Sequence, residues 1–220
     1  MIDPTAIKAR LDAATNRHKL LDHPFYKAWA AGSLTVDDLR TYSAQYWRQV
    51  EAFPGYLADL SDRVDGEPKR ALQENLADEI GDDHPGLWLD FARAVGASEE
   101  EVRSAPPEAE TARCVEAFAG ACRNESAPFA LGMLYGYESQ TPAVAATKIE
   151  GLRNHYGIDG PAVDYFSLHG ELDVEHADEL ASAVATVVKT DDDARAAEAG
   201  ATAGAQAIWG LLDGVERRIS

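Results

Sequence analysis

Three ionisable residues near the C-terminal third of the chain have the spacing of a metal site. His169 is followed by Asp173 four residues later and by His176 seven residues later. At about 100° per residue of helix, Asp173 lies roughly 40° from His169 and His176 roughly 20° to the other side. All three side chains would therefore leave one narrow stripe of a helix. Two neutral imidazoles and a carboxylate suit a transition metal ion, so the spacing predicts a metal-binding face.

The same stripe has a second interpretation that involves no metal. These offsets usually carry the apolar face of a helix, and ionisable groups are costly there unless a metal ion or water stabilises them. A solvated polar face would satisfy them as well. The neighbouring acidic residues Glu171, Glu175, Asp178 and Glu179 favour that alternative.

Three further residues could complete a metal centre. Glu79 and His84 lie around a predicted helix break near Gly81, and Glu138 lies in an apolar segment that is predicted to be buried. A buried carboxylate requires a partner. Taken together, the three carboxylates and three imidazoles suit two ferrous ions, or one iron and one manganese ion, with open positions for O2. The full ligand set is Glu79, His84, Glu138, His169, Asp173 and His176.

The elements that must position these residues are almost all predicted helices, because the apolar residues recur with a helical period. The first helix is expected to begin at Asp3-Pro4. Pro54 is expected to kink one long helix rather than end it, and Pro142 is expected to interrupt another. We therefore predict an all-α bundle of seven or eight helices that forms a single domain over residues 1–220. The expected helices cover residues 3–17, 23–31, 35–60, 68–95 with a break between Gly81 and Pro85, 108–123, 127–155, a segment after Gly160-Pro161 that carries His169, and 191–219.

Composition excludes several classes of partner. The formal net charge is −18, from 38 acidic and 20 basic residues, which disfavours binding to nucleic acids and to anionic membranes. No apolar run approaches the roughly 20 residues of a membrane span, and the N-terminus shows no signal peptide. Cys114 and Cys122 lie too far apart on one predicted helix for a disulfide, and free thiols suit a reducing compartment. The expected location is the cytoplasm.

Five segments also carry a resemblance to a known family. They are His23-Pro24-Phe25-Tyr26, Ala52-Phe53-Pro54-Gly55-Tyr56-Leu57, Asn75-Leu76-Ala77-Asp78-Glu79, Tyr137-Glu138-Ser139-Gln140-Thr141-Pro142 and the His169 motif. The chain resembles the haem-oxygenase-like di-metal oxidases, whose fold is shared with the TenA thiaminases and the PqqC oxidases. Within that family it is most similar to the p-aminobenzoate synthases related to the Chlamydia protein associating with death domains.

The resemblance implies roles for particular residues. It implies the same six metal ligands, with two transition metal ions (Fe/Fe or Fe/Mn), O2 and an external reductant. It also implies that Tyr26 is the source of the aromatic ring, that Lys148 is the amino donor and that Tyr42 lies near the site. A homodimer is expected because dimers are common in this fold. The interval between Glu79 and His84 is shorter than in those relatives, so Asp82 and Asp83 are alternatives to His84.

Other interpretations of the same residues remain open. Without the resemblance, Tyr26 would be assigned to core packing and Lys148 to the exposed side of a helix. A TenA-type thiaminase requires a nucleophilic cysteine, and neither Cys114 nor Cys122 lies in a matching motif. PqqC-type oxidases use no metal. The alternatives are a conventional di-iron oxidase that acts on a small amino acid or fatty acid, and a non-catalytic partner-binding protein.

Overall fold

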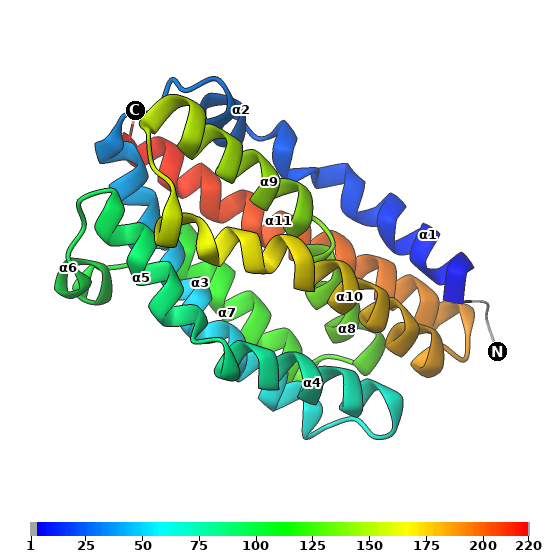
Figure 1. Ribbon diagram of the computed structural model, residues 1–220. Helices are drawn as coiled ribbons and strands as arrows, with labels where there is room; N and C mark the ends of the chain where they lie inside the picture. Colours follow the sequence, from blue (N-terminus) through cyan, green and yellow to red (C-terminus); the bar gives the residue numbers. More distant parts are fainter. Residues whose placement is uncertain (1–3, 220) are drawn as a thin grey trace.

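The computed structural model describes residues 4–219, in which helices joined by short turns and loops are the regular elements and no strand occurs (Figure 1). The all-α fold predicted from the sequence is therefore confirmed. The predicted start at Asp3 lies outside the described residues. The α-helices are α1 (Pro4–Thr15), α2 (Pro24–Ala30), α3 (Val36–Ser61), α4 (Glu67–Gly81), α5 (His84–Ala94), α6 (Glu99–Ser104), α7 (Ala109–Asn124), α8 (Ala127–Glu138), α9 (Thr141–Gly151), α10 (Asp164–Val187) and α11 (Asp191–Ile219).

The structure divides the bundle more finely than the sequence pattern did. The expected helix over residues 127–155 is two helices, α8 and α9, because the chain turns at Ser139 and Gln140 and Pro142 lies in the first turn of α9. The short helix α6 adds a further element. Short 3-10 and π turns join the longer helices: η1 (Asn16–His18), η2 (Leu20–Asp22), η3 (Leu152–Tyr156) and η4 (Gly160–Val163).

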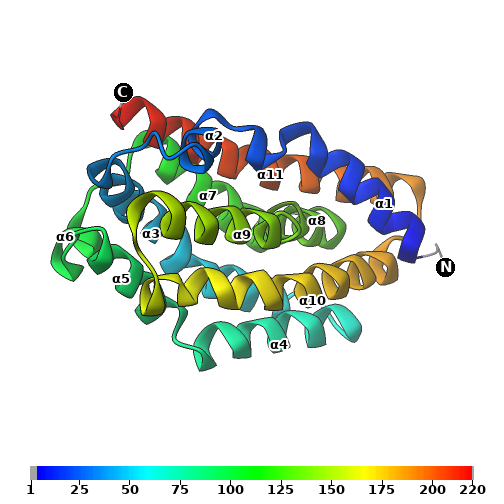
Figure 2. The same cartoon turned by 45° about the horizontal axis from the view of Figure 1, so that its top comes forward.

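Helix α10, which carries His169, lies between other helices of the bundle. It packs against α9 and α8 on one side and against α4 on the other, as Figure 2 shows. Helix α11 packs along α8 and α1, and α3 packs against α4 and α7. The C-terminal end of α4 and the start of α5 therefore come close to α8 and α10, although these elements are far apart in sequence.

Local sequence signals explain how two of these elements begin and continue. Thr35 caps α3, and its side chain forms a capping box with Asp38. Helix α3 continues past Pro54 to Ser61, so that proline does not end it. Asp83 adopts a left-handed backbone conformation with φ of 50° and accepts a hydrogen bond from the backbone N–H of Gly86. This cap lets α5 begin at His84, directly after the turn that ends α4.

Glycines in α8 allow the backbone of α11 to approach closely. A Cβ atom added at Gly132 or at Gly136 would lie 2.2 Å from the carbonyl oxygen of Ala197 or Ala201, respectively. No side chain fits in that space, so this register of α8 on α11 requires glycine. The close contact fixes the position of α8, whose last residue is Glu138.

The helices of the described chain lack the features of a membrane-spanning helix. Within residues 4–219, no helix combines the length and the apolar character that crossing a membrane requires. The core is instead rich in aromatic side chains that are completely buried, including Trp29, Trp47, Trp88 and Tyr42.

Candidate metal centre

The six predicted metal ligands are all buried and come together from four helices. Each of the six residues is 7% exposed or less. Glu79 lies near the end of α4, His84 is the first residue of α5, and Glu138 is the last residue of α8. Helix α10 supplies the stripe that the sequence predicted, namely His169, Asp173 and His176.

One half of the cluster is formed by Glu79, His84 and His169. Oε1 of Glu79 lies 3.8 Å from Nε2 of His84 and 3.9 Å from Nε2 of His169. The two imidazole rings are nearly perpendicular, with centroids 4.6 Å apart. One ligand atom from each of the three residues lies within 4.8 Å of the others, which is a separation that one metal ion can bridge.

Backbone carbonyl groups determine which nitrogen each of these histidines presents. Nδ1 of His84 lies 3.2 Å from the carbonyl oxygen of Glu79, and Nδ1 of His169 lies 2.7 Å from that of Tyr165. A carbonyl oxygen can only accept, so each Nδ1 carries the proton. Each Nε2 is then left with a lone pair that faces Glu79, and this is the arrangement that orients histidine ligands in metalloproteins.

The structure places His84, and not its acidic neighbours, in the cluster. His84 is 2% exposed, whereas Asp82 and Asp83 are exposed to solvent. Asp83 serves instead as the cap of α5. The short interval between Glu79 and His84 is accommodated because α4 ends at Gly81 and α5 starts at His84 without a longer loop.

The other half of the cluster is held by side chains rather than by the backbone. Nδ2 of Asn75 donates a hydrogen bond of 2.9 Å to Oε1 of Glu138. Nε2 of His176 lies 3.1 Å from Oδ2 of Asp78, and its Nδ1 lies 3.6 Å from Oδ1 of Asp173. Asp78 is half exposed, so this half of the cluster lies closer to solvent.

Burial and mutual charge shift the pKa values of the ligands in opposite directions. Burial, followed by the charge of Asp173, raises the pKa of Glu138 to about 8 and raises that of Glu79 well above its usual range. Burial lowers the pKa of His84 to about 4 and also lowers that of His169. Burial acts the same way on His176, but hydrogen bonds and charge from its acidic neighbours outweigh it and raise the pKa to about 9.

These groups fit the binding of divalent cations. Oε2 of Glu138 is buried and has no hydrogen-bond partner among residues 4–219, which is costly for a carboxylate. A small cavity of about 10 Å³ is lined by Glu79, Glu138, His169 and Asp173. Carboxylates crowded around such a space repel one another, and bound cations would remove that repulsion.

A second cluster, of aromatic residues around Lys148, adjoins the ligand cluster. Nζ of Lys148 donates a hydrogen bond of 2.7 Å to the hydroxyl of Tyr42, and it lies 5.5 Å from the ring centroid of Tyr26. Tyr42 and Tyr26 are themselves hydrogen-bonded. A cavity of about 10 Å³ touches Tyr26, Lys148 and His169, and it shares Tyr137, Tyr165 and His169 with the cavity between the metal ligands.

The structure corrects the expectation that Lys148 lies on an exposed helix face. Lys148 is 4% exposed, because α9 packs against α2 and α10 with Lys148 on its inner side. Its ammonium group faces five aromatic rings, and no carboxylate in the described residues offsets its charge. Burial alone lowers the pKa of Lys148 to about 7.

Sequence reasoning missed several residues that contact the predicted site. Asn75 and Asp78 belong to a segment that was used only as a sign of family resemblance. The spacing of Asn75, four residues before Glu79 on α4, was an available signal, since residues four apart share a helix face. Asp78, which directly precedes Glu79, gave no such signal. Tyr46 and Tyr137 also belong to the site, because their hydroxyls lie 3.1 Å apart and both tyrosines line the cavity beside Lys148.

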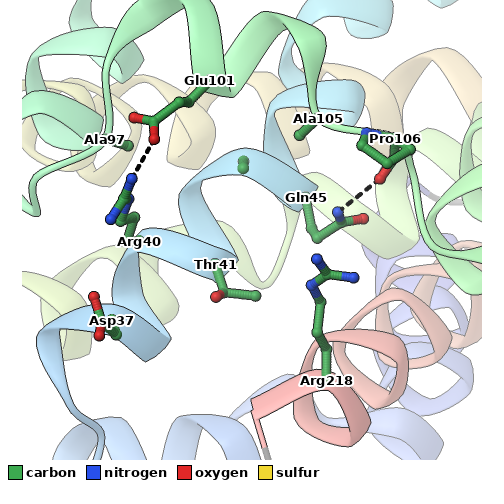
Figure 3. Close-up of a pocket in the computed structure, with 10 residues that line it drawn as sticks. Asp37, Arg40, Thr41, Gln45, Ala97, Glu101, Ala105, Pro106 and Arg218 are labelled. Carbon is green, nitrogen blue, oxygen red and sulfur yellow. Dashed lines mark hydrogen bonds and ion pairs between the residues drawn. The ribbon is translucent and has the colours of Figure 1, made fainter.

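Other cavities and clusters of the described chain are less suited to chemistry. A surface pocket of about 440 Å³ is lined by Arg40, Gln45, Glu101 and Arg218, but Figure 3 shows that Arg40 pairs with Glu101 and Gln45 with a backbone carbonyl. His23 lies near Asp213 and Glu216. Its Nδ1 accepts from the backbone N–H of Phe25 and its Nε2 faces Asp213, so both ring nitrogens are already engaged.

Comparison with known proteins agrees with this arrangement. The family described as "Iron-containing redox enzyme" matches residues 40–209. A protein of Chlamydia muridarum named 4-aminobenzoate synthase is 36% identical over 208 residues, which cover 93% of this chain and 87% of the relative. A protein of the same name from Nitrosomonas europaea is 33% identical over 221 residues, covering 94% of this chain and 90% of the relative.

Solved structures show the same fold at lower sequence identity. A TenA homologue from Pseudomonas syringae pv. tomato superimposes with a TM-score of 0.86 at 16% identity, covering 98% of this chain and 96% of the other. At that identity the likeness concerns the fold alone. From the family match and the identity to the two synthases over most of its length, we conclude that this chain belongs to the haem-oxygenase-like family of iron-containing redox enzymes.

Proposed function

We propose that this protein is a p-aminobenzoate synthase that uses its own Tyr26 as the source of the ring and Lys148 as the amino donor. Two relatives that match over most of the chain carry the name 4-aminobenzoate synthase, which supports the product. The proposed cofactor is a pair of transition metal ions, Fe/Fe or Fe/Mn, which when bound would supply oxidising power from O2 and an external reductant.

The observation that carries this proposal is the closed space between the two clusters. The cavities beside Lys148 and between the metal ligands each have a volume of about 10 Å³. A cavity must reach roughly 10–15 Å³ to hold even one water molecule. A small amino acid or a fatty acid does not fit, whereas Tyr26 and Lys148 are already in place. A substrate that belongs to the protein itself therefore suits this site best.

The proposed ligands are Glu79, His84, Glu138, His169, Asp173 and His176. Their support is the burial of all six, the free Oε2 of Glu138 and the two Nε2 atoms that face Glu79. Bound cations would favour the ionised carboxylates whose pKa values burial raises.

The residues around Tyr26 would position the two reacting side chains. Tyr42 accepts the hydrogen bond from Lys148 and is also hydrogen-bonded to Tyr26. It therefore holds the amine of Lys148 close to the phenol of Tyr26. The surrounding rings of Tyr46, Trp88 and Phe166 exclude water from the amine. Because burial lowers the pKa of Lys148 to about 7, much of the amine is neutral near neutral pH. A neutral amine has the free electron pair that an amino donor needs.

The test is a single-turnover reaction of protein in which the tyrosine rings carry 13C. The protein is incubated aerobically with iron, manganese and reductant, and p-aminobenzoate and intact chain mass are measured by mass spectrometry. We expect labelled product, at most one per chain, and a chain mass reduced by the lost side chain. Tyr26→Phe should abolish the product. Tyr56→Phe is the matched control, because Tyr56 is equally buried but packs on Phe118, away from Lys148.

Other outcomes would point to the alternative functions. Unlabelled product from an added amino acid or fatty acid, with an unchanged chain mass, would support a conventional di-iron oxidase. Function that survives replacement of His169 and His176 would support a non-catalytic partner-binding protein. The homodimer and the cytoplasmic location stay predictions, and light scattering on the purified protein would test the first.

A further inference from the structure

A buried asparagine on α4 contacts one of the proposed metal ligands. Asn75 is 3% exposed, and its Nδ2 donates a hydrogen bond of 2.9 Å to Oε1 of Glu138. Asn75 precedes Glu79 by one helical turn, so the two side chains leave α4 on the same face. Helix α4 therefore presents both a proposed ligand and an amide donor to the same cluster.

This hydrogen bond gives the two oxygens of Glu138 different surroundings. Oε1 accepts from Asn75, whereas Oε2 is buried and lacks a hydrogen-bond partner in the part of the chain that the structure describes. We propose that Asn75 is a positioning residue of the metal centre, whose amide holds Oε1 of Glu138 and so leaves Oε2 for a metal ion. This inference rests on the proposed metal centre but not on the identity of the product.

The charge of the cluster explains why an amide suits this position. Three carboxylates, of Glu79, Glu138 and Asp173, already lie together. An aspartate at position 75 would add a fourth negative charge and, when ionised, would have no proton to donate. A lysine would bring a positive charge that opposes the binding of cations. A neutral amide is the side chain that can hold a carboxylate oxygen without changing the charge that attracts the metal ions.

Asn75 has few signs of a purely structural role. Its Oδ1 is buried without a hydrogen-bond partner among residues 4–219, so the side chain does not link Glu138 to further core groups. Asparagine is also a poorer helix former than leucine, and an unpaired buried oxygen is unfavourable. The substitution Asn75→Leu, which keeps nearly the same size, should therefore preserve the fold and remove mainly the hydrogen bond to Glu138.

The experiment titrates Co2+ alone into the metal-free, full-length protein without oxygen. Visible absorption reports the coordination of Co2+, and metal analysis reports the number of bound ions. We expect wild-type protein to bind two ions. In Asn75→Leu, the dissociation constant of one ion should rise by about 10- to 100-fold, as for other residues that orient ligands, and its absorption bands should change. Gln73→Leu is the matched control, since Gln73 is an exposed amide on the same helix.

The thermal midpoint of the metal-free variants separates positioning from folding. We expect Asn75→Leu to melt within a few degrees of wild type before Co2+ is added. If it does not fold, Asn75→Ala, which also removes the amide donor without adding a charge, provides the test, and weaker Co2+ binding is expected there too.

Two results would overturn the inference, and they have different meanings. Co2+ binding with wild-type affinity and spectrum in the folded Asn75 variant would show that Asn75 does not position Glu138, and the proposed function would stand. Wild-type protein that binds no Co2+ would overturn the metal centre itself, and this inference with it.

Discussion

The ligand cluster and the aromatic cluster around Lys148 are neighbours with opposite electrostatic designs. Both are buried, and their cavities share the walls formed by Tyr137, Tyr165 and His169. The ligand cluster gathers carboxylates and imidazoles that shift one another's pKa values. In the aromatic cluster, by contrast, the amine of Lys148 faces rings, and burial alone shifts its pKa.

The difference shows what burial does with and without charged neighbours. Crowded carboxylates in a region of low polarity create a strong attraction for cations, so burial prepares the ligand cluster to bind metal ions. A single amine in a similar region has no counter-charge and becomes easier to deprotonate. The fold thus places a site for cations beside an amine that is neutral for much of the time, and the proposed reaction requires both.

The largest expected effect comes from removing the residue at the border of the two clusters. Metal ions at 1,000 times their dissociation constant stabilise a folded protein by about 4 kcal/mol, which for a chain of this length raises the melting temperature by roughly 10 °C. We expect His169→Ala to lose this rise and to form no p-aminobenzoate. Anaerobic calorimetry with and without Fe2+ and Mn2+ measures the rise.

The control for that variant is His155→Ala, because His155 is exposed and contacts a backbone carbonyl of α2. It should keep the metal-induced rise. If His169→Ala also kept the full rise, the ligand cluster would not be the site of metal binding, and the contrast between the two clusters would fail.

A smaller effect is expected from Lys148→Met, which should stabilise the folded protein rather than destabilise it. The pKa of this amine is about 7 in the folded protein and 10.5 in a solvated reference, so below pH 7 the folded state must hold a buried charge. Between these values the unfolded chain binds more protons, and wild-type stability should rise with pH. At pH 6, Lys148→Met should therefore be more stable than wild type by roughly 2–4 kcal/mol, with the gain disappearing above pH 10.

Urea unfolding across this pH range measures the effect of Lys148→Met. Lys27→Met serves as the control, since Lys27 is exposed on α2 and its replacement should change stability by no more than about 0.5 kcal/mol. A Lys148→Met protein that is less stable than wild type at pH 6 would mean that the amine has a favourable charge partner.

The smallest predicted effect is on the pH dependence of the reaction. With a pKa of about 7, the neutral fraction of Lys148 rises from about one eleventh at pH 6 to about ten elevenths at pH 8, which is about tenfold. The initial rate of p-aminobenzoate formation should rise by a similar factor. Metal content must be measured at each pH, so that loss of ions is separated from protonation of the amine. A flat profile at constant metal content would argue against Lys148 as donor.

The helices and the stripe on α10 were predictable because they depend on near neighbours in the chain. The offsets of His169, Asp173 and His176 define one face of any helix that contains them, and Thr35 and Asp38 define a helix start. Pro142 predicted an interruption of the long helix but not that α8 and α9 are separate helices, because a proline is compatible with either a kink or a new helix.

What the sequence by itself determined is the all-α fold and the identity of the candidate ligands, since periodicity and residue type are local properties. Only the tertiary structure decided which residues meet. Packing of α4, α5 and α8 around α10 brings Glu79, His84 and Glu138 to the stripe, and packing of α9 buries Lys148, which its sequence position alone would leave exposed. Contacts between distant helices depend on how their surfaces fit together, and no local pattern in the chain encodes that fit.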